Sequence, residues 1–143
     1  MNSIEISDNK SRLDVEKIHN FLTLESTWAK GIGFNVVSQS IEHSVCIGAY
    51  NNNEQAGFSR IITDHTTFAN LVDVIVWPEF RGQGISKLLM EAVLNHNSVK
   101  NIRRFTLATS NAHDLYKKFG FSALSNPNTF MEIYKPDVYD KVF

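Results

Sequence analysis

Cysteine is almost absent from this chain, which carries a single one, Cys46, among 143 residues. One thiol excludes a disulfide within the chain, and the apolar run SVCIGAY around Cys46 favours a small buried side chain over a nucleophile. No secretory leader is evident after Met1, and no apolar run reaches the roughly 20 residues that a bilayer requires. We therefore expect a soluble, cytoplasmic protein without a membrane partner.

The chain also lacks an excess of positive or negative charge. The 14 lysines and arginines nearly balance the 15 aspartates and glutamates, which gives a net charge of -1. This balance lacks the basic surface that nucleic acids or anionic membranes attract, so we expect no nucleic-acid partner. The five histidines are scattered without the close pairing of a zinc or iron site, so we expect no metal.

What is present is the composition of one ordinary globular domain, with 43% hydrophobic and 20% charged residues. A chain of 143 residues is long enough to bury a substantial core and short for two domains. It shows no repeat, low-complexity tract or linker. We predict a single domain over residues 1–143.

Apolar periodicity predicts a mixed α/β fold of the α+β kind around one twisted sheet. The polar cluster NNNEQ, residues 51–55, lies between two runs rich in β-branched and aromatic residues and predicts a hairpin turn. The apolar run 69–77 predicts a central strand that ends at a proline, which cannot donate to a ladder. In chain order, we expect a strand at 4–6, helices at 13–22 and 36–41, the hairpin, the strand at 69–77, a helix at 85–93, a strand at 103–109, a helix at 110–119, and two final strands at 121–125 and 129–136.

Capping residues and apolar spacing also predict where the helices end and which face each one buries. Asp14 is placed to cap the first helix, and Gly120 can take the left-handed position after the last one. The helix at 85–93 should rest on the sheet by a single apolar stripe. That stripe consists of Ile85, Leu88, Leu89, Ala92 and Val93.

A strand, a glycine-rich turn and a helix start meet in the segment WPEFRGQGISKLL. The first turn of a helix leaves N–H groups without partners, and the macrodipole adds about half a positive charge there. Gly82 and Gly84 keep β-carbons out of the way, and Arg81 adds a permanent charge, so the turn suits a pyrophosphate. Glycines are also common at such turns for steric reasons alone. The segment lacks the lysine of ATP loops and the distant acidic residue of NAD loops.

Two motifs here resemble those of the GNAT superfamily of N-acetyltransferases. The pyrophosphate motif of that family, Arg or Gln, x, x, Gly, x, Gly or Ala, is similar to the run from Arg81 to Ser86, with serine in the last place. The second signature is similar to NAHDLYKKFGF, with Ala112 four residues before Tyr116. Where many members have an asparagine seven residues before the tyrosine, this chain has Thr109.

The resemblance implies a single GNAT-like domain with a mostly antiparallel sheet, about four flanking helices and splayed central strands. It implies acetyl-CoA as the acyl donor, with pantetheine paired to the strand at 69–77 and pyrophosphate held by the glycine turn. The residues that it places against the cofactor are Val74, Ile75, Val76, Arg81, Gly82, Gln83, Gly84, Ile85, Ser86 and Thr109.

Transfer to an amine needs a neutral nucleophile, a stabilised oxyanion and a protonated leaving thiolate. Tyr116 matches the general acid of the family, because a phenol with a pKa near 10 can protonate a thiolate whose conjugate acid is near 8.5. The alternative is that Tyr116 only packs on the apolar face of its helix. Asp73 is the first candidate for the general base, because a carboxylate inside an apolar run must be paired or functional. The alternative is a structural pair with Arg60.

The acceptor side is less defined by the sequence. Trp28, in a predicted connection between helices, either walls the acceptor site or fills the core. Asp64 and His65, in the turn after the strand that ends the hairpin, are second candidates for the general base and are also expected on the acceptor side; a solvated polar loop is the alternative.

We expect an acetyl-CoA-dependent N-acetyltransferase acting on a primary amine of a small molecule or a peptide. The alternatives are a non-catalytic module that binds or senses acyl-CoA, and an interaction domain with a vestigial loop. The acceptor and the oligomeric state stay open, a homodimer being one option.

Overall fold

One five-stranded sheet organises the computed structural model, which describes residues 3–140. The strands lie in the order β1-β2-β3-β4-β5, with antiparallel neighbours except β5, which is parallel to β4. This confirms the predicted mixed, mostly antiparallel sheet. The ends of the predicted 1–143 domain, residues 1–2 and 141–143, lie outside the described residues. The strands are β1 Ile4–Ser7, β2 Val45–Asn51, β3 Glu54–Thr63, β4 Phe68–Val76 and β5 Arg104–Leu107.

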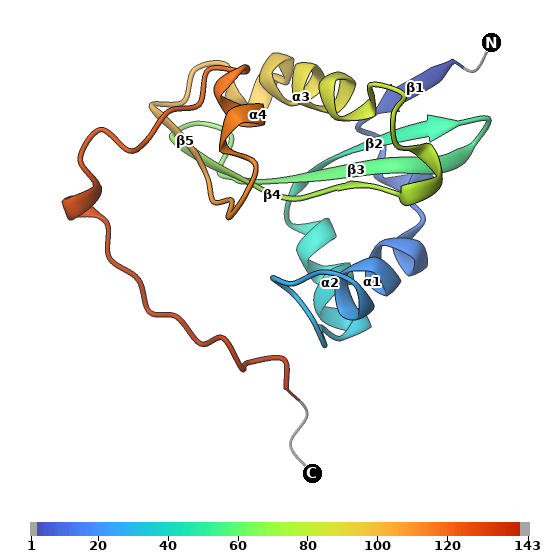
Figure 1. Cartoon of the computed structure of the whole chain (residues 1–143), viewed down its shortest axis with the longest axis horizontal. Coiled ribbons are helices and arrows are strands. Elements are labelled where there is room, and N and C mark those ends of the chain that lie inside the picture. The colour runs from blue at the N-terminus through green and yellow to red at the C-terminus, as the bar shows by residue number, and fades with distance from the viewer. Residues whose placement is uncertain (1–2, 141–143) are drawn as a thin grey trace.

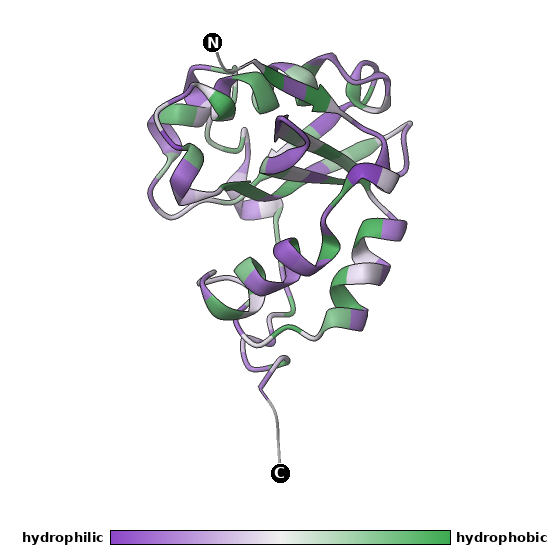
Figure 2. Cartoon of the chain, turned by 90° about the vertical axis from the view of Figure 1, so that its right-hand side faces the viewer, coloured by the Kyte–Doolittle hydropathy of each residue, from purple (hydrophilic) through white to green (hydrophobic). Residues whose placement is uncertain are grey.

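Helices cover both faces of the sheet (Figure 1). α1 (Val15–Leu24) and α2 (Phe34–Glu42) lie on one face, while α3 (Ile85–Asn95) and α4 (His113–Lys117) lie on the other. Figure 2 shows the helices banded in hydrophobic and hydrophilic residues, as expected for helices that bury one face. None of the helices in the described part of the chain is long and apolar enough to cross a membrane.

Local sequence signals account for most of these elements. The Asp14 carboxylate accepts the N–H of Lys17 at 3.1 Å, which confirms it as the cap of α1. Asn52 and Asn53 both adopt positive φ, 50° and 70°, the backbone of a primed hairpin turn. Gly120 has the predicted left-handed conformation, with φ 96°, but α4 is shorter than the predicted helix at 110–119 and already ends at Lys117.

The buried stripe of α3 is turned slightly from the predicted one. Leu88 is 37% exposed, whereas Met90 is fully buried. The face that packs on the sheet consists of Ile85, Leu89, Met90 and Val93.

Gly57 in β3 determines how closely α3 approaches the sheet. A β-carbon at this position would lie 2.9 Å from Cγ2 of Ile85 and 3.1 Å from Cδ1 of Leu89. Both distances are shorter than ordinary van der Waals contact, so only glycine lets α3 lie this close. Because Ile85 is the first residue of α3, Gly57 also sets the position of the turn before it.

The two final strands, predicted at 121–125 and 129–136, do not form, and that prediction is wrong. Residues 122–140, called the C-terminal arm below, contain only a short 3-10 turn at Pro127–Thr129. Among the described residues, the main-chain hydrogen bonds of the arm are all local, such as Thr129 N–H to the Asn126 carbonyl at 3.1 Å. A strand needs a neighbour to pair with, and alternating apolar residues alone do not provide one.

Candidate functional site

The turn between β4 and α3 is built around two glycines in left-handed conformation. Gly82 has φ 82° and Gly84 has φ 75°, values that side chains disfavour. A β-carbon added to either would meet no atom within 4 Å. The space in front of these two glycines is therefore open, and the turn is exposed from Arg81 to Gly84.

Main-chain donors line this open turn. Gly84 is the N-cap of α3 and supplies no side chain to satisfy the first-turn N–H groups of the helix. In the part of the chain that the structure describes, no main-chain hydrogen bond between elements uses the N–H of residues 82–84. The helix dipole adds to these donors, so the turn can bind an anionic group such as a diphosphate.

The side chain of Arg81 lies along the end of β4. Its Nε donates to the Val76 carbonyl at 3.2 Å, which leaves the rest of the guanidinium exposed beside the turn. Arginine stays protonated at any physiological pH, so a positive charge borders the turn permanently.

A notch opens in the sheet beside this turn. β5 pairs with β4 only from Phe68–Arg104 to Leu71–Leu107, so residues 72–76 have no strand on that side within the described chain. This geometry supports the splayed strands that the resemblance implied. The free main-chain groups of residues 72–76 can pair with a ligand that carries amides.

A β-bulge in β4 accompanies the notch. β3 pairs Phe58 with Ile75 and Arg60 with Val72, so two residues of β4, 73 and 74, lie opposite one of β3. Asp73 sits in the bulge at φ 55°, which is unusual for a residue with a side chain. A bulge bends and twists its strand, which accounts for the divergence of β4 from β5.

The Asp73 carboxylate is buried and accepts hydrogen bonds from the side chains of Trp28 and Arg60. Its Oδ1 accepts from Trp28 Nε1 at 2.8 Å, and its Oδ2 accepts from Arg60 Nε at 2.9 Å. Asp73 is 7% exposed and the Arg60 side chain 14%. Arg60 also donates to Ser44 Oγ at 3.0 Å. These contacts realise the structural pair with Arg60 that the sequence left open, and they add Trp28 to it.

Trp28 and Asp73 come together from elements 45 residues apart in the chain. Trp28 remains 51% exposed, with its ring tilted against Phe21 of α1 at 6.5 Å between centroids. The indole is therefore a wall at the surface and not a core plug. It stands on the α1 side of β4, next to the bulge.

Tyr116 lies in α4 and is half-buried. Its ring meets Phe121 edge-on at 6.1 Å, and Phe121 meets Phe105 of β5 at 5.3 Å. Burial raises the pKa of Tyr116 above its ordinary value of 10.0, so the phenol keeps its proton at neutral pH. Among the described residues, no hydrogen bond is formed by the Tyr116 hydroxyl, which leaves it free to donate.

Thr109 has a local structural role. Its hydroxyl oxygen accepts the N–H of Ala112 at 3.0 Å, just before α4 begins. The hydroxyl proton is not needed for that bond. The predicted cofactor contact of Thr109 is thus compatible with its geometry and stays a prediction.

The structure does not bring Asp64 and His65 to the turn. They follow β3, at the end of β4 opposite the glycines, and a nine-residue strand separates the two places by roughly 25–30 Å. The Asp64 carboxylate accepts the Thr67 hydroxyl and the N–H groups of Thr66, Thr67 and Phe68, and these hydrogen bonds lower its pKa. Asp64 therefore closes its own turn.

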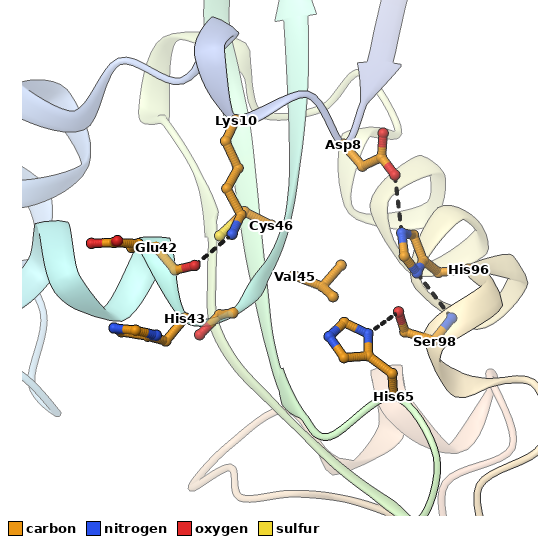
Figure 3. Close-up of a pocket in the computed structure, with 10 residues that line it drawn as sticks. Asp8, Lys10, Glu42, His43, Val45, Cys46, His65, His96 and Ser98 are labelled. Carbon is orange, nitrogen blue, oxygen red and sulfur yellow. Dashed lines mark hydrogen bonds and ion pairs between the residues drawn. The ribbon is translucent and has the colours of Figure 1, made fainter.

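His65 borders a separate pocket of about 350 Å³, shown in Figure 3. Its Nδ1 lies 2.7 Å from Ser98 Oγ, and on the same side of the pocket His96 Nε2 lies 3.0 Å from Asp8 Oδ2. Cys46 also lines the pocket, although it is buried, and burial raises the pKa of its thiol to about 11. A thiol with that pKa is almost entirely protonated at neutral pH and a poor nucleophile. Across residues 3–140, no cluster of His, Cys, Asp or Glu could hold a metal ion.

Gly57 and Ser44 contribute to the site without having been singled out in the sequence. Gly57 sets the position of the α3 start, and Ser44 supports Arg60. An isolated glycine inside a strand pattern indicates a close backbone approach, so Gly57 carried a usable signal. The bulge at Asp73 had no comparable signal, because the sequence pattern of the run 69–77 shows no break at this position.

Replacing Asp73 by asparagine should lower the free energy of unfolding by about 2 kcal/mol, because an amide nitrogen would face one of two buried donors. Chemical denaturation measures this, with Glu91→Gln, an exposed carboxylate on α3, as the control that should change little. If Asp73 is the general base instead, the folded variant should lose about 10²–10⁴-fold in kcat at temperatures where it is stable. A variant as stable as the parent would contradict the buried pair.

Comparison with known proteins gives one consistent result. Residues 42–123 match the sequence model of a family described as an acetyltransferase (GNAT) domain. The crystal structure of a Xanthomonas campestris pv. campestris protein of the GNAT family is 43% identical, with a TM-score of 0.96 over 99% of both chains. A Gibberella zeae protein with the name of an acetyltransferase is 26% identical over 134 residues, 79% of this chain and 75% of its own. A Clostridium acetobutylicum protein solved with acetyl-CoA shares the fold at 18% identity, with a TM-score of 0.66 over 94% of this chain and 96% of its own.

Proposed function

The chain belongs to the GNAT family of acetyltransferases, and from that premise we propose that it transfers the acetyl group of acetyl-CoA to a primary amine of a small molecule or a peptide. The observation that carries this proposal is the open turn with its unpaired main-chain donors, next to a notch with a free strand edge. The two features together suit one ligand with a diphosphate and a chain of amides.

The turn and β4 would bind different parts of the cofactor. The main chain of residues 82–86 would donate to the pyrophosphate, and the Arg81 guanidinium would add charge beside it. The free edge formed by Val74, Ile75 and Val76 would pair with the amides of pantetheine as an added strand. Ser86, which stands where the family motif has Gly or Ala, would offer a hydroxyl to the same phosphates. The bound thioester supplies the activated acetyl group.

Two groups of the protein would assist the chemistry. A main-chain N–H in the bulged part of β4, beside the notch, would donate to the acetyl oxygen as negative charge develops there. The Tyr116 hydroxyl would give its proton to the departing thiolate sulfur, a role that its raised pKa permits at any pH below about 10.

Trp28 and Asp73 would form the acceptor side. With both oxygens of Asp73 already accepting hydrogen bonds, we assign it a positioning role: it fixes the indole of Trp28 at the mouth of the notch and carries the strained bulge. The exposed face of Trp28 would then contact the acceptor. The catalytic-base role of Asp73 stays a prediction, tested by the asparagine variant above. Asp64 and His65 have no part in this proposal.

Coenzyme A should raise the melting temperature of the protein. A ligand present at 100 times its dissociation constant stabilises by about 2.7 kcal/mol, which a thermal melt resolves easily. ATP at the same concentration is the control, because it has the phosphates but no pantetheine for the β4 edge. Release of free thiol from acetyl-CoA is then followed with a panel of primary amines.

The outcomes separate the candidate functions. Stabilisation by CoA together with amine-dependent thiol release supports the acetyltransferase. Stabilisation without release from any amine would indicate the non-catalytic acyl-CoA-binding module. A melting temperature unmoved by CoA and acetyl-CoA would contradict both and leave an interaction domain.

A further inference from the structure

Arg60 has a guanidinium that the protein uses only in part. Its Nε donates to Asp73 Oδ2 at 2.9 Å, and its Nη1 donates to Ser44 Oγ at 3.0 Å. The third nitrogen, Nη2, has no hydrogen-bond partner among the described residues. A guanidinium carries its five N–H donors in one plane, so the two bonds that hold it also fix the direction of Nη2.

The free nitrogen is open to a ligand although the side chain that carries it is mostly buried. The Arg60 side chain is 14% exposed. Within residues 3–140, the Tyr50 hydroxyl is the only side-chain nitrogen or oxygen that is both fully buried and unpaired. Because Nη2 is also unpaired and is not among these buried atoms, it reaches accessible space. A charged donor at the edge of a buried network binds an anion more strongly than one surrounded by water.

Strand pairing shows on which face of the sheet Nη2 lies. Arg60 of β3 lies opposite Val72 of β4, and residues that lie opposite one another project to the same face. This is the face of Trp28, since Arg60 and Trp28 share the Asp73 carboxylate. The next row on this face crosses β3, β4 and β5 and consists of Ile62, Asn70 and Thr106.

The helices leave this part of the sheet uncovered. Ile62 is 44% exposed, and Phe68, two residues before Asn70 on the same face, is 40% exposed. Figure 1 shows α1 and α2 below β2 and β3, while β5 lies beyond them. We call the side chains that residues 60–62, 68–73 and 104–106 present here the open face. An acceptor can approach the β4 bulge across it, next to Trp28.

The charges of the open face favour an anionic group on the acceptor. Its strand segments contain two arginines, Arg60 and Arg104, and one carboxylate, Asp73. Arg104 lies beside Phe68 in the parallel pairing of β5 with β4, on the same face. Both oxygens of Asp73 already accept hydrogen bonds, so no free carboxylate in these segments can hold a second ammonium group. A free arginine nitrogen, by contrast, is ready to donate.

We propose, as a step that rests on the acetyltransferase function above, that the acceptor is an amino carboxylate and that Arg60 Nη2 binds its carboxylate. An amino carboxylate here is a small molecule with a free primary amine and a free carboxylate, such as an amino acid. Arg60 Nε lies 2.9 Å from the Asp73 carboxylate, so the guanidinium is next to the bulge where the acetyl group would be held. Binding the carboxylate there would direct the amine toward the acetyl carbon.

The transfer leaves the carboxylate of the acceptor unchanged. The amine nitrogen forms a bond to the acetyl carbon, and the bond from that carbon to sulfur breaks. The departing thiolate takes up a proton, and the amine gives one to water. Arg60 touches only the carboxylate, so its contribution is to select and orient the acceptor.

Matched acceptors test the substrate class on the parent protein. Thiol release from acetyl-CoA is measured with glycine, β-alanine and a set of L-amino acids, each beside its own carboxamide. Values of kcat/KM are referred to the neutral amine, because its share differs between an acid and its amide. A charge-assisted hydrogen bond predicts a kcat/KM about 10- to 100-fold higher for the best acid than for its amide.

The outcomes distinguish this proposal from the function on which it rests. Acetylation of amines without a preference for acids would overturn the amino carboxylate and leave the acetyltransferase standing. Thiol release with none of the acids, their amides or the other primary amines would overturn both.

Arg60→Lys tests the residue. Lysine keeps a positive charge beside Asp73 but presents one nitrogen in place of the planar fork. The ratio of kcat/KM between acid and amide should fall to about one. A purely structural role of Arg60 would lower both values alike and leave the ratio unchanged. Arg104→Lys, at the other arginine of the open face, is the matched control and should keep the parent ratio.

A second variant keeps the test decisive if a thermal melt shows that Arg60→Lys does not fold. Ser44→Ala removes only the hydroxyl that orients the guanidinium, and it should lower the ratio about threefold or more. A parent ratio retained in Arg60→Lys, or in Ser44→Ala where Arg60→Lys is unfolded, would overturn the role of Arg60. Loss of the ratio in Arg104→Lys would overturn it as well.

Discussion

A Gly84→Val variant should fold and yet lose its affinity for CoA, with a dissociation constant raised about 100-fold or more, a loss of at least about 2.7 kcal/mol of binding free energy. Gly84 has φ 75°, and a β-carbon there meets no protein atom within 4 Å. The valine side chain would therefore enter the space proposed for the pyrophosphate and not the core. The left-handed backbone would cost about 1–2 kcal/mol of stability, which a domain of this size tolerates.

Isothermal titration with CoA measures this effect, and a thermal melt without ligand verifies the fold. Gly33→Val is the matched control: Gly33 is also a helix N-cap with open space at its β-carbon, but it begins α2 and has an ordinary φ of −75°. It should bind CoA as the parent does. A folded Gly84→Val protein with unchanged CoA affinity would remove the turn from the proposed site.

Tyr116→Phe should lower kcat by about 10²–10⁴-fold while leaving CoA affinity unchanged, because it removes only the proton of the general acid. The phenyl ring keeps the edge-on contact with Phe121, so the variant should be as stable as the parent. Steady-state thiol release gives kcat, and titration calorimetry gives the affinity. Tyr50→Phe is the control, since Tyr50 is also buried with a raised pKa but lies on β2 under Arg12.

The pH dependence of kcat provides a second readout of Tyr116. A general acid works only while protonated, so activity falls as pH rises through its pKa. Burial raises that pKa above 10.0, hence the alkaline limb due to Tyr116 should lie above pH 10. Equal kcat in Tyr116→Phe and the parent, at neutral pH, would contradict the acid role and favour a packing role for the ring.

Much of the fold could be predicted from the sequence because its signals are local. A carboxylate before an apolar-periodic run predicted the cap at Asp14, and consecutive asparagines predicted the turn between β2 and β3. The final strands could not be predicted correctly. Their alternation is real, but whether an alternating segment becomes a strand depends on a neighbouring edge, and the chain leads this segment away from its own β5.

The site divides in the same way. The glycine turn was recognisable because backbone conformation and the lack of a β-carbon are properties of the residues themselves. Only one of the two partners of Asp73 could be proposed from the sequence. The pair with Arg60 was an open alternative, whereas the hydrogen bond from Trp28 was not predicted. Residues in different elements meet only after the sheet and helices have packed.

The sequence by itself determined an open, main-chain-lined turn at the start of α3 and a tyrosine in α4, since these depend on local φ preferences and on motif spacing. Only the tertiary structure decided that β4 is bulged and parts from β5, that Asp73 is engaged by Arg60 and Trp28, and that the last segment leaves the sheet. The physical reason is that strand pairing and burial are set by contacts between distant segments, whose free energy no local pattern contains.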